Sequence, residues 1–154
     1  MSKKVRLDRI VSHLELREIR AKYCYAIDER DWNEFRTLFT DDPVLDFGAM
    51  GVYKGRDGLD RFINEFVENQ LLGSAHLLAN PLIEIDGDEA TGAWYVNSPI
   101  TFTDGTGAWR LGRYDDEYRR IDGRWRIDHI QLRFIYTADY DGETWSDLCL
   151  VSKS

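Results

Sequence analysis

The chain has 154 residues, of which 43% are hydrophobic, and it carries 20 Lys and Arg residues against 28 Asp and Glu residues. A folded chain of this length buries about 68–70% of its unfolded surface. We therefore expect a single domain over residues 1–154, with a core at about 12–136 and a tail at 137–154. The net charge of −8 disfavours binding to nucleic acid or to an anionic membrane.

Cysteine usage and local motifs limit the chemistry further. The two cysteines, Cys24 and Cys149, are too few for a disulfide framework, and neither has a second cysteine or histidine at metal-ligand spacing. No glycine-rich phosphate loop, G-x-S-x-G elbow or His-x-x-x-His pair occurs, so no metal and no cofactor are predicted. Charged residues recur from Asp8 onward and interrupt any long apolar run, so we predict no signal peptide and no membrane helix. We expect a cytoplasmic protein.

The first part of the chain has the periodicity of helices. Ser12 and Glu15 have the spacing of a capping box, and the apolar stripe behind them predicts a helix over 12–28. The stripe consists of Leu16, Ile19, Tyr23, Ala26 and Ile27. Asp31 and Glu34 repeat the capping pattern and predict a second, short helix.

The next segment predicts a hairpin and a third helix. Asp-Asp-Pro at 41–43 ends the second helix. Short strand-like runs at 44–47 and 52–53 flank a turn with two glycines, which predicts a small hairpin. Apolar residues then recur at three- and four-residue spacing, so we predict a helix over about 57–70.

The remainder of the chain is a series of predicted strands. They are expected at 74–80, 82–86, 90–103, 109–121 and 124–136. Asp122-Gly123 between the last two is a strong signal for a tight hairpin. Helices at the front and an antiparallel meander behind them indicate an α+β fold in which the helices cover one face of a curved sheet. Such a sheet encloses a concavity suited to a small molecule.

Histidine is scarce, so each one bears on possible chemistry. Alternation places His76 on one face with Ser74 and Asn80, which is compatible with a buried histidine bonded to a carbonyl and with a catalytic base. We interpret His129, on the last strand, as a residue of the sheet surface. His13 is interpreted as an exposed residue in the first turn of the first helix.

Two charged residues lie beside apolar sequence. Asp28 closes the first helix at about 140° from Tyr23 on an ideal wheel, so periodicity alone describes it as a solvated acid. Arg133 stands between Leu132 and Phe134 on a strand and needs a carboxylate, a carbonyl or a ligand as its partner. A structural ion pair and a binding role are both open for Arg133.

Several local strings occur together in one order along the chain. They are Tyr-x-x-Ala-Ile-Asp at 23–28, Asp-Trp at 31–32, Leu-Phe-Thr-Asp-Asp at 38–42, Tyr-Lys-Gly at 53–55, Ala-His at 75–76 and Tyr-Arg-Arg-Ile-Asp-Gly-x-Trp at 118–125. With this order, the chain resembles the SnoaL-like branch of the nuclear transport factor 2-like superfamily. Within that branch it is similar to scytalone dehydratase, bile acid 7α-dehydratase and hexachlorocyclohexane dehydrochlorinase.

The resemblance implies a fold and a set of site residues. The fold is a cystatin-like cone, with N-terminal helices on a strongly curved, mainly antiparallel sheet. Family members keep an aspartate and a histidine as a dyad, which here are Asp28 and His76. The bile acid dehydratase pattern adds a tyrosine and a last-strand arginine, matched here by Tyr23 and Arg133.

The chain also departs from these enzymes. Where the dehydratases have a pocket tyrosine after the second helix this chain has Phe47, and where the bile acid enzyme has an acid on the central strand it has Ser98. The last-strand arginine of the dehydrochlorinase aligns with Ile130, which lowers the expectation of chloride elimination. Together with Phe47 and Ser98, Trp94 and Trp109 are expected to contact a hydrophobic substrate, although the aromatic residues fit a plain core equally well.

The resemblance implies a cofactor-independent lyase that removes water from a hydrophobic cyclic compound with a carbonyl group. His76 would take the acidic proton, Asp28 would orient it, and Tyr23 or Arg133 would bond the enolate oxygen. A ketosteroid isomerase-like or polyketide cyclase-like enzyme needs the same base. A non-catalytic subunit, like the small subunit of aromatic-ring hydroxylases, is the alternative from another class.

Partners are expected to be a hydrophobic small molecule and further copies of the chain. A long sheet rich in Trp and Tyr leaves an exposed apolar face unless a partner covers it. The resemblance implies a homo-oligomer, with a trimer favoured over a dimer because trimers are common among the dehydratases.

Overall fold

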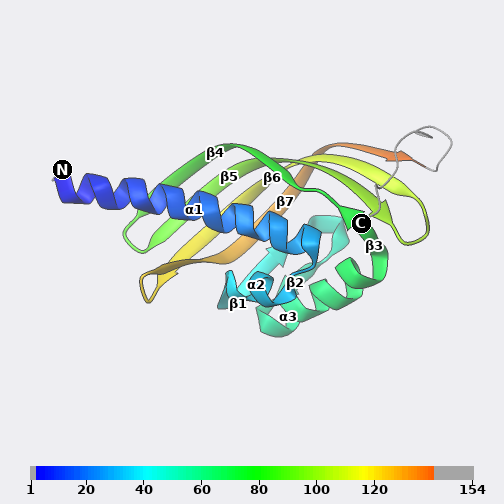
Figure 1. Cartoon of the computed structure of the whole chain (residues 1–154), viewed down its shortest axis with the longest axis horizontal. Helices are drawn as coiled ribbons and strands as arrows, with labels where there is room; N and C mark the ends of the chain where they lie inside the picture. Colours follow the sequence, from blue (N-terminus) through cyan, green and yellow to red (C-terminus); the bar gives the residue numbers. More distant parts are fainter. Residues whose placement is uncertain (1–2, 141–154) are drawn as a thin grey trace.

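The computed structural model describes residues 3–140. Its helices are α1 (Lys3–Glu29), α2 (Trp32–Thr37) and α3 (Gly55–Arg61), the last continued by a π-helical segment at Phe62–Glu68. Its strands are β1 (Phe39–Asp46), β2 (Val52–Lys54), β3 (Leu71–Ser74), β4 (Leu77–Asp86), β5 (Glu89–Phe102), β6 (Gly107–Ile121) and β7 (Arg124–Tyr140) (Figure 1). The predicted tail therefore begins inside β7, and its part from 141 onward, with Cys149, lies outside the described residues.

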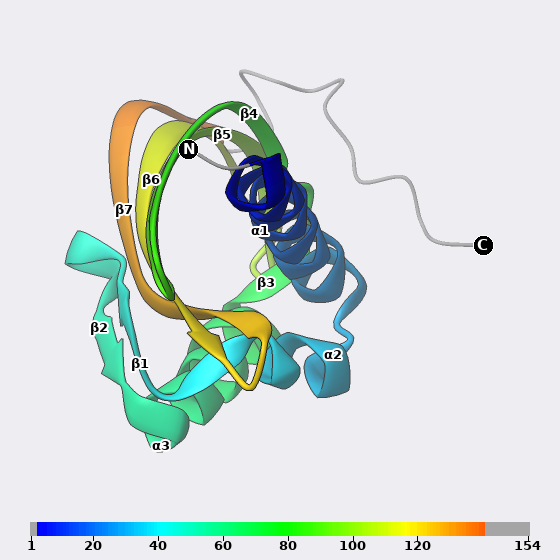
Figure 2. The same ribbon diagram turned by 90° about the vertical axis from the view of Figure 1, so that its left-hand side faces the viewer.

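One sheet wraps around the helices. Its strand order is β2-β1-β7-β6-β5-β3, with β4 also paired to β5. All pairings are antiparallel except that of β1 with β7. Figure 2 shows β4 to β7 curling into an open cone, with α1 across its concave side and α2 and α3 at one end. The chain has the α+β cone expected from its sequence.

The first helix begins earlier than its capping pattern predicts. α1 starts at Lys3, and Ser12 lies inside it, 3% exposed, with its hydroxyl accepting a hydrogen bond from Arg120 at 3.3 Å. The predicted start of this helix at Ser12 is therefore wrong, because Ser12 has the spacing of a capping residue but lies inside the helix and faces the sheet. The second cap is confirmed, because the Asp31 carboxylate accepts a bond from the Glu34 backbone N–H. No described helix is long and apolar enough to cross a membrane.

The first long strand prediction also needs correction. The chain breaks between β3 and β4 at residues 75–76, whereas we predicted the break at Pro81. Asn80 has a φ of 51° and causes a register shift, yet pairing with β5 resumes at Leu82. β4 therefore tolerates the proline as an irregularity and continues to Asp86.

The long strands bend and turn where their sequences permit it. Asp122 and Gly123 have φ values of 50° and 74°, the geometry of a two-residue type I′ hairpin. A Cβ atom at Gly112 would lie 2.8 Å from the Arg133 carbonyl oxygen, so only glycine allows this close approach of β6 and β7. The irregular pairing next to Gly112 helps to curve the sheet over the helices.

Candidate active site

The end of α1 and the link between β3 and β4 bring Asp28 and His76 together. The two-residue link leaves the His76 backbone N–H outside the strand ladder, and it donates to Asp28 Oδ2 at 2.7 Å. The His76 ring presents Nδ1 to Asp28 Oδ1, also at 2.7 Å, and the Ser74 hydroxyl donates to the same oxygen at 2.8 Å. The expected hydrogen bond between Asp28 and His76 is therefore present, and three donors hold the carboxylate in place.

A narrow apolar cavity lies in front of His76 inside the cone. About 50 Å³ of it is open to water-sized molecules. Most of its wall is apolar: Ile27, Phe47, Met50, Phe62, Phe66, Leu71, Val96, Ile100, Leu132 and Phe134. Its polar groups are His76, two tyrosines, a serine and an arginine, and no carboxylate is among the described residues that line it. A ring-sized molecule needs the partly exposed side chains at the edge, such as Met50 and Phe134, to move aside.

Two tyrosines form the side of the cavity nearest the centre of the cone. Tyr23 and Tyr114 are 1% and 2% exposed, and their rings pack edge to face with their centres 6.3 Å apart. Burial raises the pKa of both, that of Tyr114 to about 12, while the nearby Arg20 opposes the rise. Both phenols are thus neutral near pH 7 and available as proton donors.

Arg20 holds the tyrosines from behind. Its guanidinium carbon lies 4.2 Å from the ring centre of Tyr23 and 4.0 Å from that of Tyr114. Arg20 Nε lies 3.1 Å from Asp116 Oδ2, and both side chains are fully buried. Burial lowers the pKa of Arg20, but Asp116 and the rings outweigh it, so the group stays charged.

The structure brings four of the predicted residues to the cavity wall, and a fifth lies nearby. Tyr23, Phe47, His76 and Ser98 line it, with Asp28 behind His76. Trp94 also faces into the cone and is 5% exposed, but it lies deeper, where its indole N–H donates to the Tyr118 hydroxyl at 3.1 Å.

Arg133 and Trp109 lie elsewhere, which corrects the expectation drawn from the resemblance. Leu132 and Phe134 take the inward positions of β7, so Arg133 between them points outward and pairs with Asp115. Trp109 alternates with inward-facing Ala108 and donates to Asn97 Oδ1 on the outer face at 2.7 Å. Neither residue lines the cavity.

Sequence reasoning missed four residues that face the inside of the cone: Arg20, Arg110, Tyr114 and Asp116. A two-residue period from Tyr118 back along β6 passes through Asp116, Tyr114 and Arg110, so alternation could have placed all three on the inner face. Arg20 is four residues after Leu16 and three before Tyr23, within the apolar stripe of α1. A charged residue at the helical spacing of an apolar stripe was the pattern that could have identified Arg20 as buried.

The other two histidines stand apart from the cavity. His129 borders a shallow hollow on the outer face of the sheet with Glu84 and Gln131, as its interpretation as a sheet-surface residue predicts. His13 is half-buried on α1. Of the three histidines, His76 alone lines the cavity.

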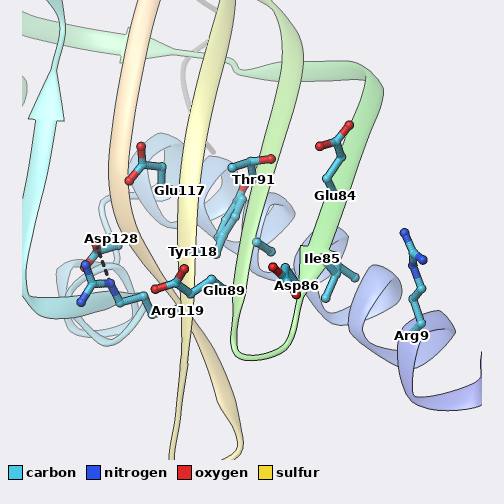
Figure 3. A pocket seen from close by; sticks show the side chains of 11 residues that line it. Arg9, Glu84, Ile85, Asp86, Glu89, Thr91, Glu117, Tyr118, Arg119 and Asp128 are labelled. Atoms are coloured by element: carbon cyan, nitrogen blue, oxygen red, sulfur yellow. Dashed lines mark ion pairs between the residues drawn. The ribbon is translucent and has the colours of Figure 1, made fainter. Parts of the chain in front are cut away.

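A second, wider hollow lies at the β4–β5 turn. Figure 3 shows its acidic side chains, which include Glu84, Asp86 and Glu117, with an ion pair between Arg119 and Asp128 at its edge. Its described lining contains no histidine, and no group of three potential metal ligands occurs within residues 3–140. The cavity beside His76 therefore offers the better arrangement for proton transfer.

Comparison with protein families places this geometry in a known group. A family model described as the SnoaL-like domain matches residues 8–131. The chain belongs to the SnoaL-like family. A relative from Mycobacterium tuberculosis, named as an uncharacterised protein, is 31% identical over 128 residues, which cover 77% of this chain and 82% of the relative.

Other relatives of this SnoaL-like protein include named lyases. Hexachlorocyclohexane dehydrochlorinase 1 of Sphingobium indicum is 22% identical over 126 residues, covering 80% of this chain and 82% of that enzyme. A crystal structure of hexachlorocyclohexane dehydrochlorinase LinA, type 2, has a TM-score of 0.83 at 21% identity, over 88% of this chain and 93% of that chain. A Novosphingobium aromaticivorans protein named after scytalone dehydratase has a TM-score of 0.78 at 23% identity, over 86% and 90%. These structures share the fold.

Proposed function

We propose that this SnoaL-like protein is a cofactor-independent lyase that dehydrates a hydrophobic cyclic compound carrying a carbonyl group. The observation that carries the proposal is the Asp28–His76 pair at 2.7 Å, with the imidazole facing an apolar cavity. The dehydrochlorinase and dehydratase names among its relatives support an elimination reaction.

In the proposed first step, His76 removes a proton from the carbon next to the substrate carbonyl. The Nδ1–H of His76 donates to Asp28 Oδ1, so Nε2 keeps its lone pair and accepts the proton. Asp28 stabilises the imidazolium that results and keeps the ring in one orientation. The electron pair of the broken C–H bond moves to the carbonyl oxygen and forms an enolate.

The enolate then expels a hydroxyl group from the neighbouring carbon. Tyr23 and Tyr114 both line the cavity with neutral hydroxyl groups, and in our proposal one of them donates a hydrogen bond to the substrate oxygen. A preorganised donor of this kind stabilises a developing oxyanion by about 2.7–4 kcal/mol. The departing hydroxide takes up a proton from solvent and leaves as water, which balances the proton that His76 later returns to solvent, and the product is an α,β-unsaturated carbonyl compound.

The dyad must return its proton before the next turnover. Asp28 and His76 also border a groove on the outer side of the cone, between α1 and β4, together with exposed Tyr25 and Leu77. His76 is 10% and Asp28 21% exposed. In our proposal, His76 exchanges its proton with solvent through this groove.

Dehydration is tested with cyclic β-hydroxy ketones, by following the ultraviolet absorbance of the enone product. We expect turnover by the wild type and none by His76→Ala. Migration of a double bond in β,γ-unsaturated ketones, without dehydration, would favour the isomerase alternative. Tight binding of such compounds without turnover would favour the non-catalytic alternative.

We also propose that the chain forms a homo-oligomer, with a trimer favoured. Leu82 and Tyr95 on the outer sheet face are 74% and 45% exposed, and Leu14 on α1 is 62% exposed. Light scattering should return a multiple of the 18.0 kDa chain mass. A mass of one chain at micromolar concentration would contradict this proposal.

A further inference from the structure

Two polar residues of the cavity wall have no part in the proposed proton transfer. They are Ser98 on β5 and Arg110 on β6, and both line the cavity beside His76. An apolar pocket with a few converging polar groups uses those groups to orient its ligand. Their positions and partners therefore bear on what the ligand carries.

Strand register sets His76, Ser98 and Arg110 in a row across the inner face. Ser98 pairs directly with Arg110 across β5 and β6. On its other side, Ser74 pairs with Ile100 and Leu77 with Asn97, so His76 in the link between them comes alongside Ser98. Adjacent strands lie about 4.8 Å apart, so the backbones of His76 and Arg110 are about 10 Å apart, on opposite sides of the serine.

The Ser98 hydroxyl needs a partner. Ser98 is 3% exposed, and its Oγ has no hydrogen-bond partner among the described residues. Buried hydroxyl groups are nearly always hydrogen-bonded, because an unpaired one loses its interaction with water without replacement. A ligand oxygen in the cavity would supply the missing partner.

Arg110 brings the only side chain with a full positive charge to the described cavity wall. Its side chain is 18% exposed and pairs with Asp139, whose own side chain is 74% exposed. Such an exposed carboxylate is well solvated and contributes little as an ion-pair partner. A ligand carboxylate in the apolar cavity is less screened and competes well for the guanidinium.

We infer that Ser98 and Arg110 form a subsite that binds a carboxylate group of the substrate. The inference rests on the proposed function for the His76 end of the cavity and adds a substrate class to it. The substrate is a hydrophobic cyclic acid, with its carboxylate on Arg110 and Ser98 and its acidic C–H bond at His76. Asp139 occupies the guanidinium in the free protein, and the substrate displaces it.

Matched pairs of acids and amides test the subsite by isothermal titration calorimetry. Benzoate is compared with benzamide, and 2-naphthoate with 2-naphthamide, on the wild type and on Arg110→Met, Ser98→Ala and Asp139→Asn. We expect the wild type to bind each acid about tenfold or more tightly than its amide. Arg110→Met should remove this preference, Ser98→Ala should reduce it, and Asp139→Asn should raise the affinity for the acids.

Arg133→Met is the matched control, because Arg133 is an ion-paired arginine on the next strand that points outward. It should keep the preference for acids. An equal affinity for acid and amide in the wild type, a preference that survives in Arg110→Met, or no binding of either acid at millimolar concentration would overturn the inference. If Arg110→Met does not fold, Asp139→Asn decides, and unchanged affinity for the acids would overturn the inference.

His76→Ala separates this inference from the proposed function. It should keep the preference for acids, because the subsite is built from β5 and β6 and the base is not. A preference for acids in a protein without lyase turnover would support the carboxylate subsite and contradict the proposed lyase function. Turnover of neutral ketones without any preference for acids would support the lyase function and contradict the subsite.

Discussion

Two acid–base clusters join α1 to the sheet, eight residues apart along the helix. At its end, Asp28 bonds His76, and two turns earlier Arg20 pairs with Asp116. The Arg20 pair is fully enclosed: Tyr118 donates to Asp116 at 2.6 Å, and the rings of Tyr23 and Tyr114 cover the guanidinium. Arg20 and His76 both border the outer groove, but of the two only His76 also lines the apolar cavity.

This difference separates a scaffold from a reactive site. Arg20 and Asp116 form an ion pair whose side chains are fully buried, so the removal of either should affect folding. Asp28, which accepts a bond from Ser74, holds one edge of the His76 ring and leaves the other edge to the cavity, so removal of His76 should affect chemistry. The clusters differ in burial, and of the two only the Asp28–His76 pair presents a side chain to the apolar cavity.

The largest expected effect is on turnover in His76→Ala. We expect kcat to fall by about 10²–10⁴-fold, because a positioned general base contributes that much, while the melting temperature changes little. Steady-state kinetics and calorimetry measure the two quantities. His129→Ala, which changes a histidine on the outer face, should leave kcat unaltered. A large loss of stability with an unaltered rate would make His76 a structural residue.

The enclosed cluster should show the opposite behaviour. Arg20→Met leaves Asp116 buried without its partner, and we expect a loss of about 3–5 kcal/mol in the free energy of unfolding. Urea denaturation measures it. Lys22→Met removes an exposed ion pair with Glu18 on the same helix and should cost less than about 1 kcal/mol. Equal losses in the two variants would contradict the scaffold role.

The tyrosine pair connects the two clusters and should affect kcat. Both tyrosines line the cavity, so the double variant Tyr23→Phe/Tyr114→Phe lacks every phenol hydroxyl in the described cavity wall, and we expect kcat to fall about 10²–10³-fold. Steady-state kinetics of the two single variants then identifies the tyrosine that donates. An unaltered kcat in the double variant would contradict the donor role.

The smallest expected effect is on the stability of the fold at low pH. It concerns Asp115 on the outer face of the sheet, which belongs to neither cluster. Burial raises the pKa of Asp115, but its bonds to Arg113 and Arg133 outweigh this and lower it overall. Its stabilising contribution is therefore complete above the unfolded-state pKa and is lost as the pH falls through the lower folded-state value. Asp115→Asn should flatten the loss of stability between about pH 5 and pH 2.5, by less than about 1 kcal/mol. An unchanged slope would contradict this.

Periodicity predicted most helices and strands well, but it wrongly described the face of α1 that carries Asp28 as solvated. The stripe of α1 and the Asp122-Gly123 turn depend on local backbone geometry, which sequence patterns report directly. Asp28 lies off the stripe, and a helical wheel describes it as solvated. The curled sheet covers more of the end of α1 than one stripe, because the β3–β4 link reaches around to Asp28.

The part of the candidate site that could be predicted is the Asp28–His76 pair, because the resemblance names both residues. Asp28 and His76 are 48 residues apart in the sequence, and no local pattern joins them. Arg133 was predicted at the site from the resemblance alone. Side chains alternate along a strand, so Arg133 faces the side of β7 opposite to the inward-facing Leu132. Arg110 was missed because it lies near the beginning of β6, where an arginine is usually solvated.

Hydrogen–deuterium exchange at the carbon next to a carbonyl tests the central claim most directly. A panel of hydrophobic cyclic ketones is incubated in D₂O with the protein, and proton NMR follows the loss of the acidic C–H signals. The method reports proton removal by His76 whether or not a hydroxyl group then leaves. We predict exchange that the wild type accelerates, Asp28→Asn slows and His76→Ala abolishes. Exchange at the same rate in the wild type and in His76→Ala would contradict the role of His76 as the base.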